Sequence, residues 1–414
     1  MRTIDTASAT FPGVPRADVP RALILICAVA LAIATNYTSH GPVLGLIGGE
    51  FHLDAGSAGA IATAFFLGSA VVMLAGGAMA DRWGPRTVVT FGFLVTCIGT
   101  LGCGLLAPSY PALLAWRFLG GMGAGIAFAA GAVYTRSIFA GRGQHLAQGL
   151  YGSAFLAGSA LPLVYMALLA GADGDWRRGY VASAIGTLLV WAAWYRLAPE
   201  SPRSGSPEPL RAGLARALAA RESWLLGLCH MCGFGLAMVL GTWVVSYLTD
   251  EYSVPLLLSG LLGSLILALG IAGRSGGALA LERGLAPLRL IRIGIALAAV
   301  GLATMALTGP LALTLAGLLA TGLGVGLPYA AVFNGAAASV PTSPGSAQAI
   351  VGWGGNLTAV FGPPLVGAIL DASGGFRGGF LAIAAFAVVV LLASRAMRPF
   401  ALRPGPSVAL DESG

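Results

Sequence analysis

The residue whose chemistry stands out most in the sequence is an arginine inside an apolar stretch. Arg274 follows the run Leu-Ala-Leu-Gly-Ile-Ala-Gly and precedes Glu282 by eight residues, or about 12 Å of helix. At that depth in a membrane a guanidinium costs several kcal/mol unless it is paired or faces a wet cavity. None of the 16 acidic residues falls near the middle of an apolar stretch, so no carboxylate is expected to pair with Arg274. A free fork of N–H donors suits a carboxylate or another oxyanion.

Two interpretations of Arg274 remain open from the sequence. The side chain either binds an anionic ligand or extends to the membrane interface and donates to backbone carbonyls. A second arginine, Arg117, lies about 9 Å from the opposite edge of its own apolar stretch, where a structural role at the rim and a ligand contact are equally open. Arg136, at the other end of that stretch, is expected to be structural.

Histidine, aromatic and amide side chains add polar groups to the apolar stretches. The run Asn-Tyr-Thr-Ser-His at residues 36–40 interrupts the first stretch before Gly41. His40 and His230 are the only groups within the stretches that change charge near neutral pH, and each also suits a hydrogen-bonded packing role. Further polar or aromatic groups are Tyr37, Tyr151, Tyr329, Asn334, Trp353 and Asn356.

Several other chemistries lack the residues that they require. The apolar stretches hold no pair of carboxylates, no histidine-rich metal set and no nucleophile with a neighbouring base, which argues against an enzyme. Cys229 and Cys232 form a Cys-x-x-Cys, but no second pair or histidine cluster completes a zinc site. A chain without lysine has no phosphate-binding Gly-x-x-x-x-Gly-Lys loop, which excludes ATP-driven transport by this polypeptide. We expect no enzyme activity, no metal and no cofactor.

The elements that carry these residues are apolar enough to lie in lipid. Of 414 residues, 57% are hydrophobic and 9% are charged, with a mean hydropathy of +0.84, whereas soluble domains carry about 25% charged residues. A membrane-spanning helix needs about 20 apolar residues. We expect an all-α membrane protein with 12 transmembrane helices, six on each side of a polar central segment. The stretches lie near residues 22–47, 56–80, 87–107, 111–139, 146–170, 179–198, 223–248, 256–280, 288–308, 311–335, 346–370 and 376–395.

The arginines indicate which side of the membrane each connection faces. All 23 basic residues are arginine, and 18 of them fall on the side of the amino terminus if every stretch crosses the membrane. The positive-inside rule makes that side the cytoplasm, so we expect both termini there, in the plasma (inner) membrane of a bacterium. The formal charge of +7 follows from this distribution and requires no nucleic acid as a partner. The first stretch is too long for a removable signal peptide.

Two motifs recur about 200 residues apart and divide the chain into equivalent halves. Gly-Gly-Ala-Met-Ala-Asp-Arg-Trp-Gly at residues 76–84 returns as Gly-Gly-Ala-Leu-Ala-Leu-Glu-Arg-Gly at 276–284, and the glycine-rich run 121–130 returns at 322–331. We expect two pseudo-symmetric six-helix bundles with a binding site between them. The expected divisions are a cytoplasmic tail (1–20), a bundle (21–198), a cytoplasmic linker with a short amphipathic helix (199–221), a second bundle (222–398) and a cytoplasmic tail (399–414).

Two segments resemble signatures of the major facilitator superfamily. The pattern Gly-x-x-x-Asp-Arg-x-Gly-x-Arg at residues 77–86 is similar to the cytoplasmic loop after the second helix of that family. The run Arg-Phe-Leu-Gly-Gly-Met-Gly at 117–123 is similar to its fourth-helix signature. The resemblance covers roughly residues 21–398 and implies the major facilitator fold.

The resemblance also implies a latch between the two halves. In the family the loop holds the halves together in the outward-open state, and here Asp81 is expected to meet the positive amino terminus of the helix that begins near residues 343–345. Pro85 stands where a second basic residue is common, so the basic cluster is weaker. The implied latch residues are Gly77, Asp81, Arg82, Gly84 and Arg86.

Family members that transport carboxylates or nitrate also carry an arginine at the position that resembles Arg274, which implies an anionic substrate. Nitrate porters add an arginine on the second helix, where this chain has Val-Met-Leu at 72–74, so a small organic anion ranks above nitrate. Residues 36–40 resemble the Asn-Tyr-x-Asp-Arg run of organic-anion symporters, but Ser39 and His40 replace its charged pair, which puts carboxylate-based proton coupling in doubt. The implied substrate-binding residues are Arg274, Tyr37, His40, Tyr151, His230, Tyr329, Asn334, Trp353 and Asn356.

The expected function is secondary or facilitated transport of a small organic anion by alternating access of the two halves. The protein is expected to act as a monomer in the lipid bilayer, with a coupling proton or ion left open. The alternative is an efflux antiporter for drugs or hydrophobic metabolites, although residues 158–162 lack the Gly-Pro pair of the antiporter signature. A sensor would require a soluble signalling domain, which the sequence lacks.

Overall fold

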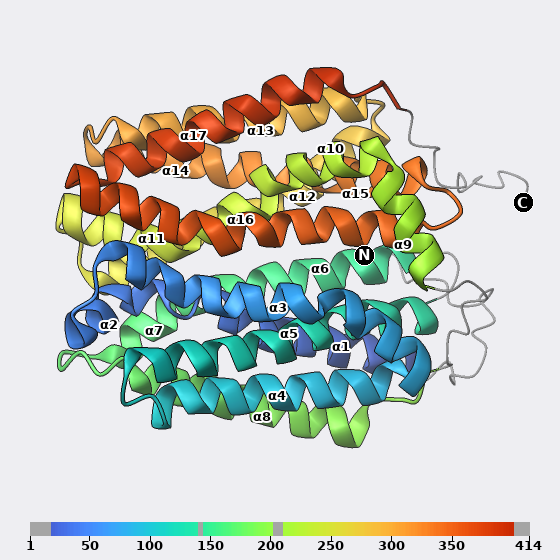
Figure 1. The fold of residues 1–414 in the computed structure, drawn as a ribbon, viewed down its shortest axis with the longest axis horizontal. Coiled ribbons are helices and arrows are strands. Elements are labelled where there is room, and N and C mark those ends of the chain that lie inside the picture. Colours follow the sequence, from blue (N-terminus) through green and yellow to red (C-terminus); the bar gives the residue numbers. More distant parts are fainter. Residues whose placement is uncertain (1–17, 140–143, 202–209, 401–414) are drawn as a thin grey trace, which may run out of the picture.

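Helices are the only regular secondary structure in the computed structural model, which describes residues 18–139, 144–201 and 210–400 (Figure 1). In lipid every backbone N–H and C=O needs a partner within the protein, and a helix satisfies both groups within one segment. Within these described ranges, ten helical stretches are long and apolar enough to cross a membrane. Helices α8 (Arg177–Leu197) and α16 (Pro344–Ser373) fall outside those ten but run along the same bundle.

The chain forms two groups of helices, the first half below and the second half above in Figure 1. The first half contains α1 (Val19–Thr38), η2 (Gly41–Val43), α2 (Leu44–Phe51), α3 (Ala55–Trp83), α4 (Pro85–Leu105), α5 (Tyr110–Ile138), α6 (Gln144–Ala160), α7 (Pro162–Ala170) and α8. The second half follows α9 (Leu210–Ala219) and contains α10 (Arg221–His230), η3 (Met231–Gly235), α11 (Leu236–Tyr252), α12 (Leu256–Glu282), α13 (Pro287–Ala306), α14 (Leu311–Gly326), α15 (Tyr329–Ser339), α16, α17 (Phe376–Ala393) and η4 (Ser394–Ala396).

The helices run from one end of the bundle to the other. We call the end where α1 begins and η4 lies the terminal end, and the opposite end the distal end. At the terminal end, Arg21 at the start of α1 donates to the Leu197 carbonyl at 2.7 Å, and Arg292 donates to the Ser394 carbonyl at 3.1 Å. Helix α9 lies at this end and packs against the start of α16. The distal end carries the loop before α3, where the Asp54 carboxylate accepts a hydrogen bond from the Ser57 backbone N–H at 2.6 Å. This bond lowers the pKa of Asp54 and caps the helix.

The repeated glycine motifs make equivalent helix contacts in the two halves. A Cβ atom at Gly121 of α5 would lie 2.0 Å from the Phe65 backbone oxygen of α3. In the second half, a Cβ atom at Gly322 of α14 would lie 2.9 Å from the Ile266 backbone oxygen of α12. In both pairs the absence of a side chain lets the backbones touch, which is the main way for helices to associate closely in lipid.

Four of the long helical spans are interrupted. The span 19–51 changes to a 3-10 turn at Gly41, and the span that ends at residue 170 is divided at Leu161. The span 221–252 contains the π-helical turn η3, and the span 311–339 is divided at Leu327. Pro162 begins α7, where its missing N–H is tolerated. Helix α16 continues through its Pro-Pro pair at 363–364.

The two halves contact along a seam formed by η2, α3, α6 and α7 on one side and by α11, α12 and α16 on the other. Near the distal end the seam is tightly packed, because Thr63 donates to the Val360 carbonyl at 2.6 Å and a Cβ atom at Gly59 would lie 2.6 Å from the Pro363 carbonyl. The distal end is therefore closed in this conformation.

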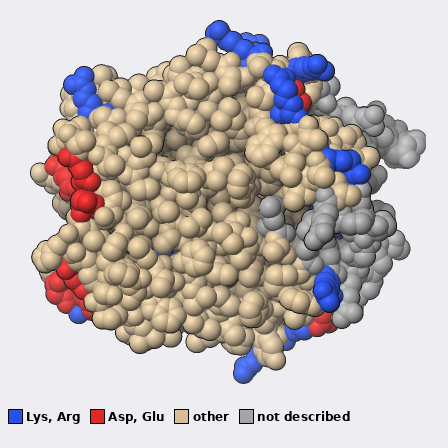
Figure 2. Space-filling model, in the orientation of Figure 1, with Lys and Arg blue, Asp and Glu red and all other residues tan. Residues whose placement is uncertain are grey.

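The outer surface matches a protein that lies in a membrane. Figure 2 shows that the charged side chains on this face gather at the two ends of the bundle and leave an uncharged belt between them. Large apolar side chains are exposed on the helices, such as Leu189 at 67% and Phe361 at 66%. Burying such side chains in lipid removes the cost of exposing them to water.

Candidate functional site

Arg274 of α12 reaches across the seam. Its Nη1 donates to the Gly152 carbonyl of α6 at 3.3 Å, and its guanidinium carbon lies 3.9 Å from the centroid of the Tyr329 ring. Its Nε is buried without an acceptor. Throughout the described residues, no carboxylate forms an ion pair with Arg274. One long bond to a carbonyl uses one of the five N–H donors of the guanidinium and leaves its positive charge without a counter-ion.

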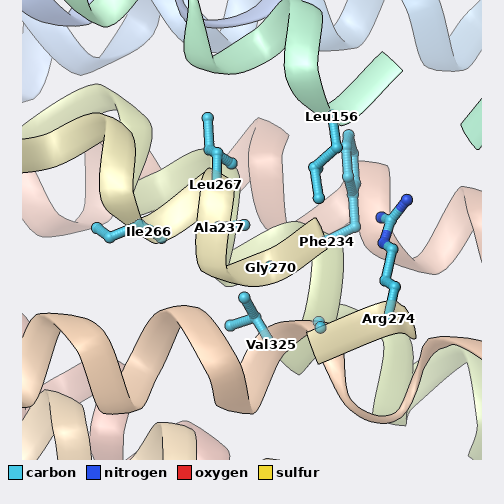
Figure 3. Close-up of a pocket in the computed structure, with 10 residues that line it drawn as sticks. Leu156, Phe234, Ala237, Ile266, Leu267, Gly270, Arg274 and Val325 are labelled. Atoms are coloured by element: carbon cyan, nitrogen blue, oxygen red, sulfur yellow. The ribbon is translucent and has the colours of Figure 1, made fainter. Parts of the chain in front are cut away.

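A small cavity adjoins Arg274 at the seam (Figure 3). Its volume of about 10 Å³ holds roughly one water molecule. Figure 3 shows the Phe234 ring beside Leu156, with the Arg274 side chain extending next to them. Arg274 is the only residue with a polar side chain in this lining. The lining residues are Leu156, Gly233, Phe234, Ala237, Ile266, Leu267, Gly270, Arg274, Val325 and Gly326.

Aromatic rings form a continuous path from the first half to Arg274. Tyr37 lies edge-on to Phe155 at a centroid distance of 4.8 Å. Phe234 continues the path in the second half, at 6.1 Å from Phe155, and His230 stacks on Phe234 at the same distance. Edge-to-face and offset contacts of this kind stabilise ring pairs. The path consists of Phe65, Phe66, Tyr37, Phe155, Phe234, His230, Phe333 and Tyr329.

Phe234 is the functional candidate that the sequence did not predict. It belongs both to the cavity lining and to the aromatic path, where it contacts Tyr37 and Phe155 of the other half. It sits on η3, and π-helical turns of this kind are frequent at functional sites because they redirect side chains. The only signal in the sequence is the pair of glycines at 233 and 235 on either side of it.

His40 joins the two halves through a hydrogen-bond chain. Nη2 of Arg117 lies 3.1 Å from Nδ1 of His40, and His40 Nε2 lies 3.0 Å from Oγ1 of Thr242 in α11. A guanidinium only donates, so Nδ1 must accept, and Nε2 carries the hydrogen. The Thr242 hydroxyl donates onward to the Met238 carbonyl at 3.0 Å, which leaves its oxygen to accept from His40. These partners assign a neutral imidazole to His40.

Arg117 is held by backbone and side-chain acceptors. It is 2% exposed, and its Nη1 donates to the Asn36 carbonyl at 2.9 Å and lies 3.2 Å from the Ser39 hydroxyl. Its guanidinium carbon also lies 4.5 Å from the centroid of the Phe65 ring. This environment favours the structural interpretation of Arg117 over ligand contact.

Of the predicted binding residues, Tyr329 lies against Arg274, and Tyr37 and His230 lie on the aromatic path. Tyr151 and Asn356 have other partners. Tyr151 stacks on Phe128 and donates to its carbonyl at 2.9 Å. Asn356 donates to the Gly352 carbonyl at 3.2 Å and contacts Met73 Sδ, and its amide oxygen is buried without a partner. The remaining two differ in burial, with Trp353 of α16 half-buried and Asn334 of α15 exposed.

The loop that resembles the latch lies at the terminal end. Gly84 adopts a positive φ of 89° between α3 and α4, which requires glycine, whereas a Cβ atom at Gly77 would have no neighbour within 4 Å. Arg82 is exposed, and Arg86 binds the Tyr195 carbonyl at 2.8 Å and pairs with Glu200. Arg86 is thus held within the first half.

The remaining residues of the predicted latch region have less defined surroundings. The Asp81 side chain lies outside the described part of the structure. Arg136 is exposed at the end of α5, and its Nη1 lies 3.5 Å from the place that a Cβ atom of Gly345 would occupy. The start of α16 therefore lies next to the first half at the terminal end.

Two equivalent helical halves that meet along a seam are the architecture typical of multi-pass membrane transporters of small solutes. Residues 26–344 match the family described as Major Facilitator Superfamily, and the chain therefore belongs to this superfamily. Its members are membrane transporters, not enzymes, and the chain is accordingly a transporter that has a small solute as its partner.

Similar proteins include transporters of different solutes. The chain is 26% identical over 345 residues to a protein of Thermus thermophilus named "probable nitrate/nitrite antiporter", over 76% of this chain and 77% of that protein. It is 30% identical over 259 residues to a "probable sulfoacetate transporter" of Cupriavidus necator, over 58% and 59% of the two chains. The fold matches the inward-facing, unoccupied structure of a bacterial homologue of the human lysosomal transporter Spinster, with a TM-score of 0.76, 18% identity, and 92% and 98% coverage.

Proposed function

We propose that the chain is a secondary or facilitated carrier that moves a small organic anion by exposing Arg274 alternately at the two ends of the bundle. The observation that carries this proposal is the Arg274 guanidinium at the seam, which has a buried Nε without an acceptor and, among the described residues, no carboxylate partner. A buried cation without a counter-ion is costly, and an anionic ligand supplies the missing charge. The names of the two relatives, which refer to nitrate, nitrite and sulfoacetate, support an anionic solute.

An organic anion is favoured over nitrate because Arg274 is the single cation in the cavity lining. Nitrate carries its charge on three oxygens and loses hydration on all sides when it is bound. A carboxylate presents both oxygens on one edge, which matches the two-point geometry of one guanidinium. On α3, Met73 offers a thioether against Asn356 and no second positive charge.

The transport cycle that we propose has the two bundles as its moving parts. Residues 21–198 and 222–398 rock about the seam, residues 199–221 link them, and the tails are residues 1–20 and 399–414. The arginine distribution favours a bacterial inner membrane with both termini in the cytoplasm. We further propose a monomer. If a proton is coupled, the candidate carriers are His40 in the hydrogen-bond chain and His230 on the aromatic path, because an imidazole changes charge near neutral pH.

Efflux of hydrophobic compounds is the second candidate function. The observation that favours it is the apolar character of the cavity lining, in which Arg274 is the exception. A hydrophobic cation would be repelled by an unpaired guanidinium at this site. The two candidates therefore differ in whether the solute must carry a negative charge.

Purified protein in proteoliposomes distinguishes these functions. Saturable uptake of a labelled monocarboxylate, recovered chemically unchanged from the vesicle lumen, is the expected result. Movement of lipophilic cations such as ethidium, with no movement of any carboxylate, would support efflux of hydrophobic compounds instead. Chemical conversion of the solute would contradict both transport candidates.

A further inference from the structure

Nine of the ten residues that line the Arg274 cavity have no polar side chain. We propose, as an extension of the proposed anion transport, that the substrate is a monoanion with an apolar body. The carboxylate binds Arg274, and the apolar body packs against Phe234 and Leu156.

The charge of the site sets the charge of the substrate. One guanidinium neutralises one carboxylate, and a second anionic group on the same molecule would lie against aliphatic walls such as Ile266 and Val325. Burying an unpaired charge against such walls is strongly unfavourable. Dicarboxylates and other dianions are therefore excluded from tight binding by the same lining that accepts an apolar body.

The space for the apolar body lies between the two halves. A Cβ atom at Gly270 of α12 would lie 3.2 Å from Cδ2 of Leu156 of α6, so these helices touch through a leucine side chain and a glycine. In this conformation the cavity of about 10 Å³ is too small for an organic ligand, and the ligand enters when the halves separate there. Because Gly270 has no side chain, the apolar body then lies beside Leu156.

The position of Phe234 connects the ligand to both halves. Its ring lies 6.5 Å from Tyr37, 6.4 Å from Phe66 and 6.1 Å from Phe155, between centroids, and it also lines the cavity. When an apolar ligand body takes the place of these ring contacts, it covers the same apolar surface of the rings. That surface therefore stays buried from water.

The anionic head changes the contact between α12 and α6 at Arg274. Arg274 holds the Gly152 carbonyl of α6 at 3.3 Å, and a carboxylate is a stronger acceptor than a neutral carbonyl. The ligand therefore exchanges a bond between the two halves for a bond to itself. Binding of the head loosens α6 from α12 while the apolar body fills the space between them.

The experiment uses the full chain purified in detergent. It measures how the affinity depends on the size and the charge of the ligand. Isothermal titration of acetate, 3-methylbutanoate, phenylacetate, succinate, nitrate and neutral phenylacetamide separates the contribution of the head from that of the body. Each buried methylene adds about fourfold to affinity. We expect phenylacetate and 3-methylbutanoate to bind at least about tenfold more tightly than acetate, and succinate, nitrate and phenylacetamide to bind more weakly than phenylacetate.

Two variants assign the preference for size to Phe234. Phe234→Ala is expected to bring the affinity for phenylacetate to within about threefold of that for acetate, and Phe234→Leu is expected to keep part of the preference with an intact fold. Phe361→Ala is the matched control, because Phe361 is 66% exposed on the outer surface. It should leave the order of affinities unchanged.

The failures of the two proposals give different results. Tighter binding of nitrate or succinate than of phenylacetate, lost in Arg274→Gln, would overturn the apolar body and leave anion transport standing. Equal binding of phenylacetamide and phenylacetate would overturn the monoanionic head. An unchanged preference for phenylacetate in both Phe234 variants would overturn the role of Phe234. Binding of none of these anions would overturn the proposed function as well.

Discussion

The Asp371 carboxylate accepts a hydrogen bond from the Gly56 backbone N–H at 2.8 Å, which ties the last turn of α16 to the first turn of α3 across the seam. Its other oxygen accepts from the Ala55 N–H at 2.9 Å. The free N–H groups at a helix start carry partial positive charge, so an anion there is stabilised. The two helices run antiparallel from this point.

We expect Asp371→Asn to open the distal end. The amide keeps one acceptor oxygen but loses the negative charge and one of the two hydrogen bonds. The population of the distal-open state should rise by about fivefold. Spin labels at Ser109 and Leu307, two exposed distal positions in opposite halves, report the separation in a background without the five native cysteines. Asp173→Asn, which breaks an ion pair within the first half, is the control and should leave the distance distribution unchanged.

A second prediction concerns the glycine contact between α7 and α12. A Cβ atom at Gly260 would lie 1.9 Å from the Leu163 carbonyl oxygen, a distance that no methyl group tolerates. Gly260→Ala is expected to separate the halves at the distal end, with a longer distance between the same labels. Gly276→Ala on the same helix places its methyl group in open space and serves as the matched control. An unchanged distal distance in a folded Gly260→Ala protein would contradict the closed packing described for this end.

A third prediction follows from the neutral His40 between Arg117 and Thr242. Glutamine in its place offers an oxygen to Arg117 and an N–H to Thr242, so His40→Gln is expected to keep a melting temperature close to wild type. Phenylalanine fills similar volume but leaves the buried Arg117 donor and the Thr242 oxygen without partners, which costs about 1–3 kcal/mol per group. Thermal unfolding of His40→Phe should therefore begin at a clearly lower temperature. Equal stability of the two variants would show that the hydrogen-bond chain contributes nothing.

The fold could be predicted to a large extent because lipid restricts the choice of structure. Apolar runs of sufficient length indicate helices, and the recurrence of Gly121 as Gly322 indicates equivalent halves, which the structure shows as equivalent contacts on α3 and α12. Arg274 could be identified for a related reason, since a guanidinium in an apolar stretch is costly and conspicuous. A charged residue within an apolar stretch can be seen in the sequence alone.

The remaining features depend on contacts between distant segments. Phe234 reaches the cavity through a π-helical turn, whose extra residue per turn is not visible in the periodicity of the sequence. Thr242 becomes the partner of His40 only when the halves dock, 202 residues apart in the chain. The partners of Asp371 are backbone N–H groups, which every residue except proline carries, so no residue type in the sequence marks them.

Counterflow of a labelled monocarboxylate in proteoliposomes tests the central claim most directly, with Arg274→Gln and the exposed Arg283→Gln compared side by side. Both variants lose one positive charge from the same region of the chain, but only Arg274 lies at the seam. Losing a charged hydrogen-bond partner of the ligand is expected to lower transport by about tenfold to a hundredfold in Arg274→Gln, with Arg283→Gln close to wild type. Wild-type counterflow by a folded Arg274→Gln protein would contradict the assignment of Arg274 as the anion-binding residue.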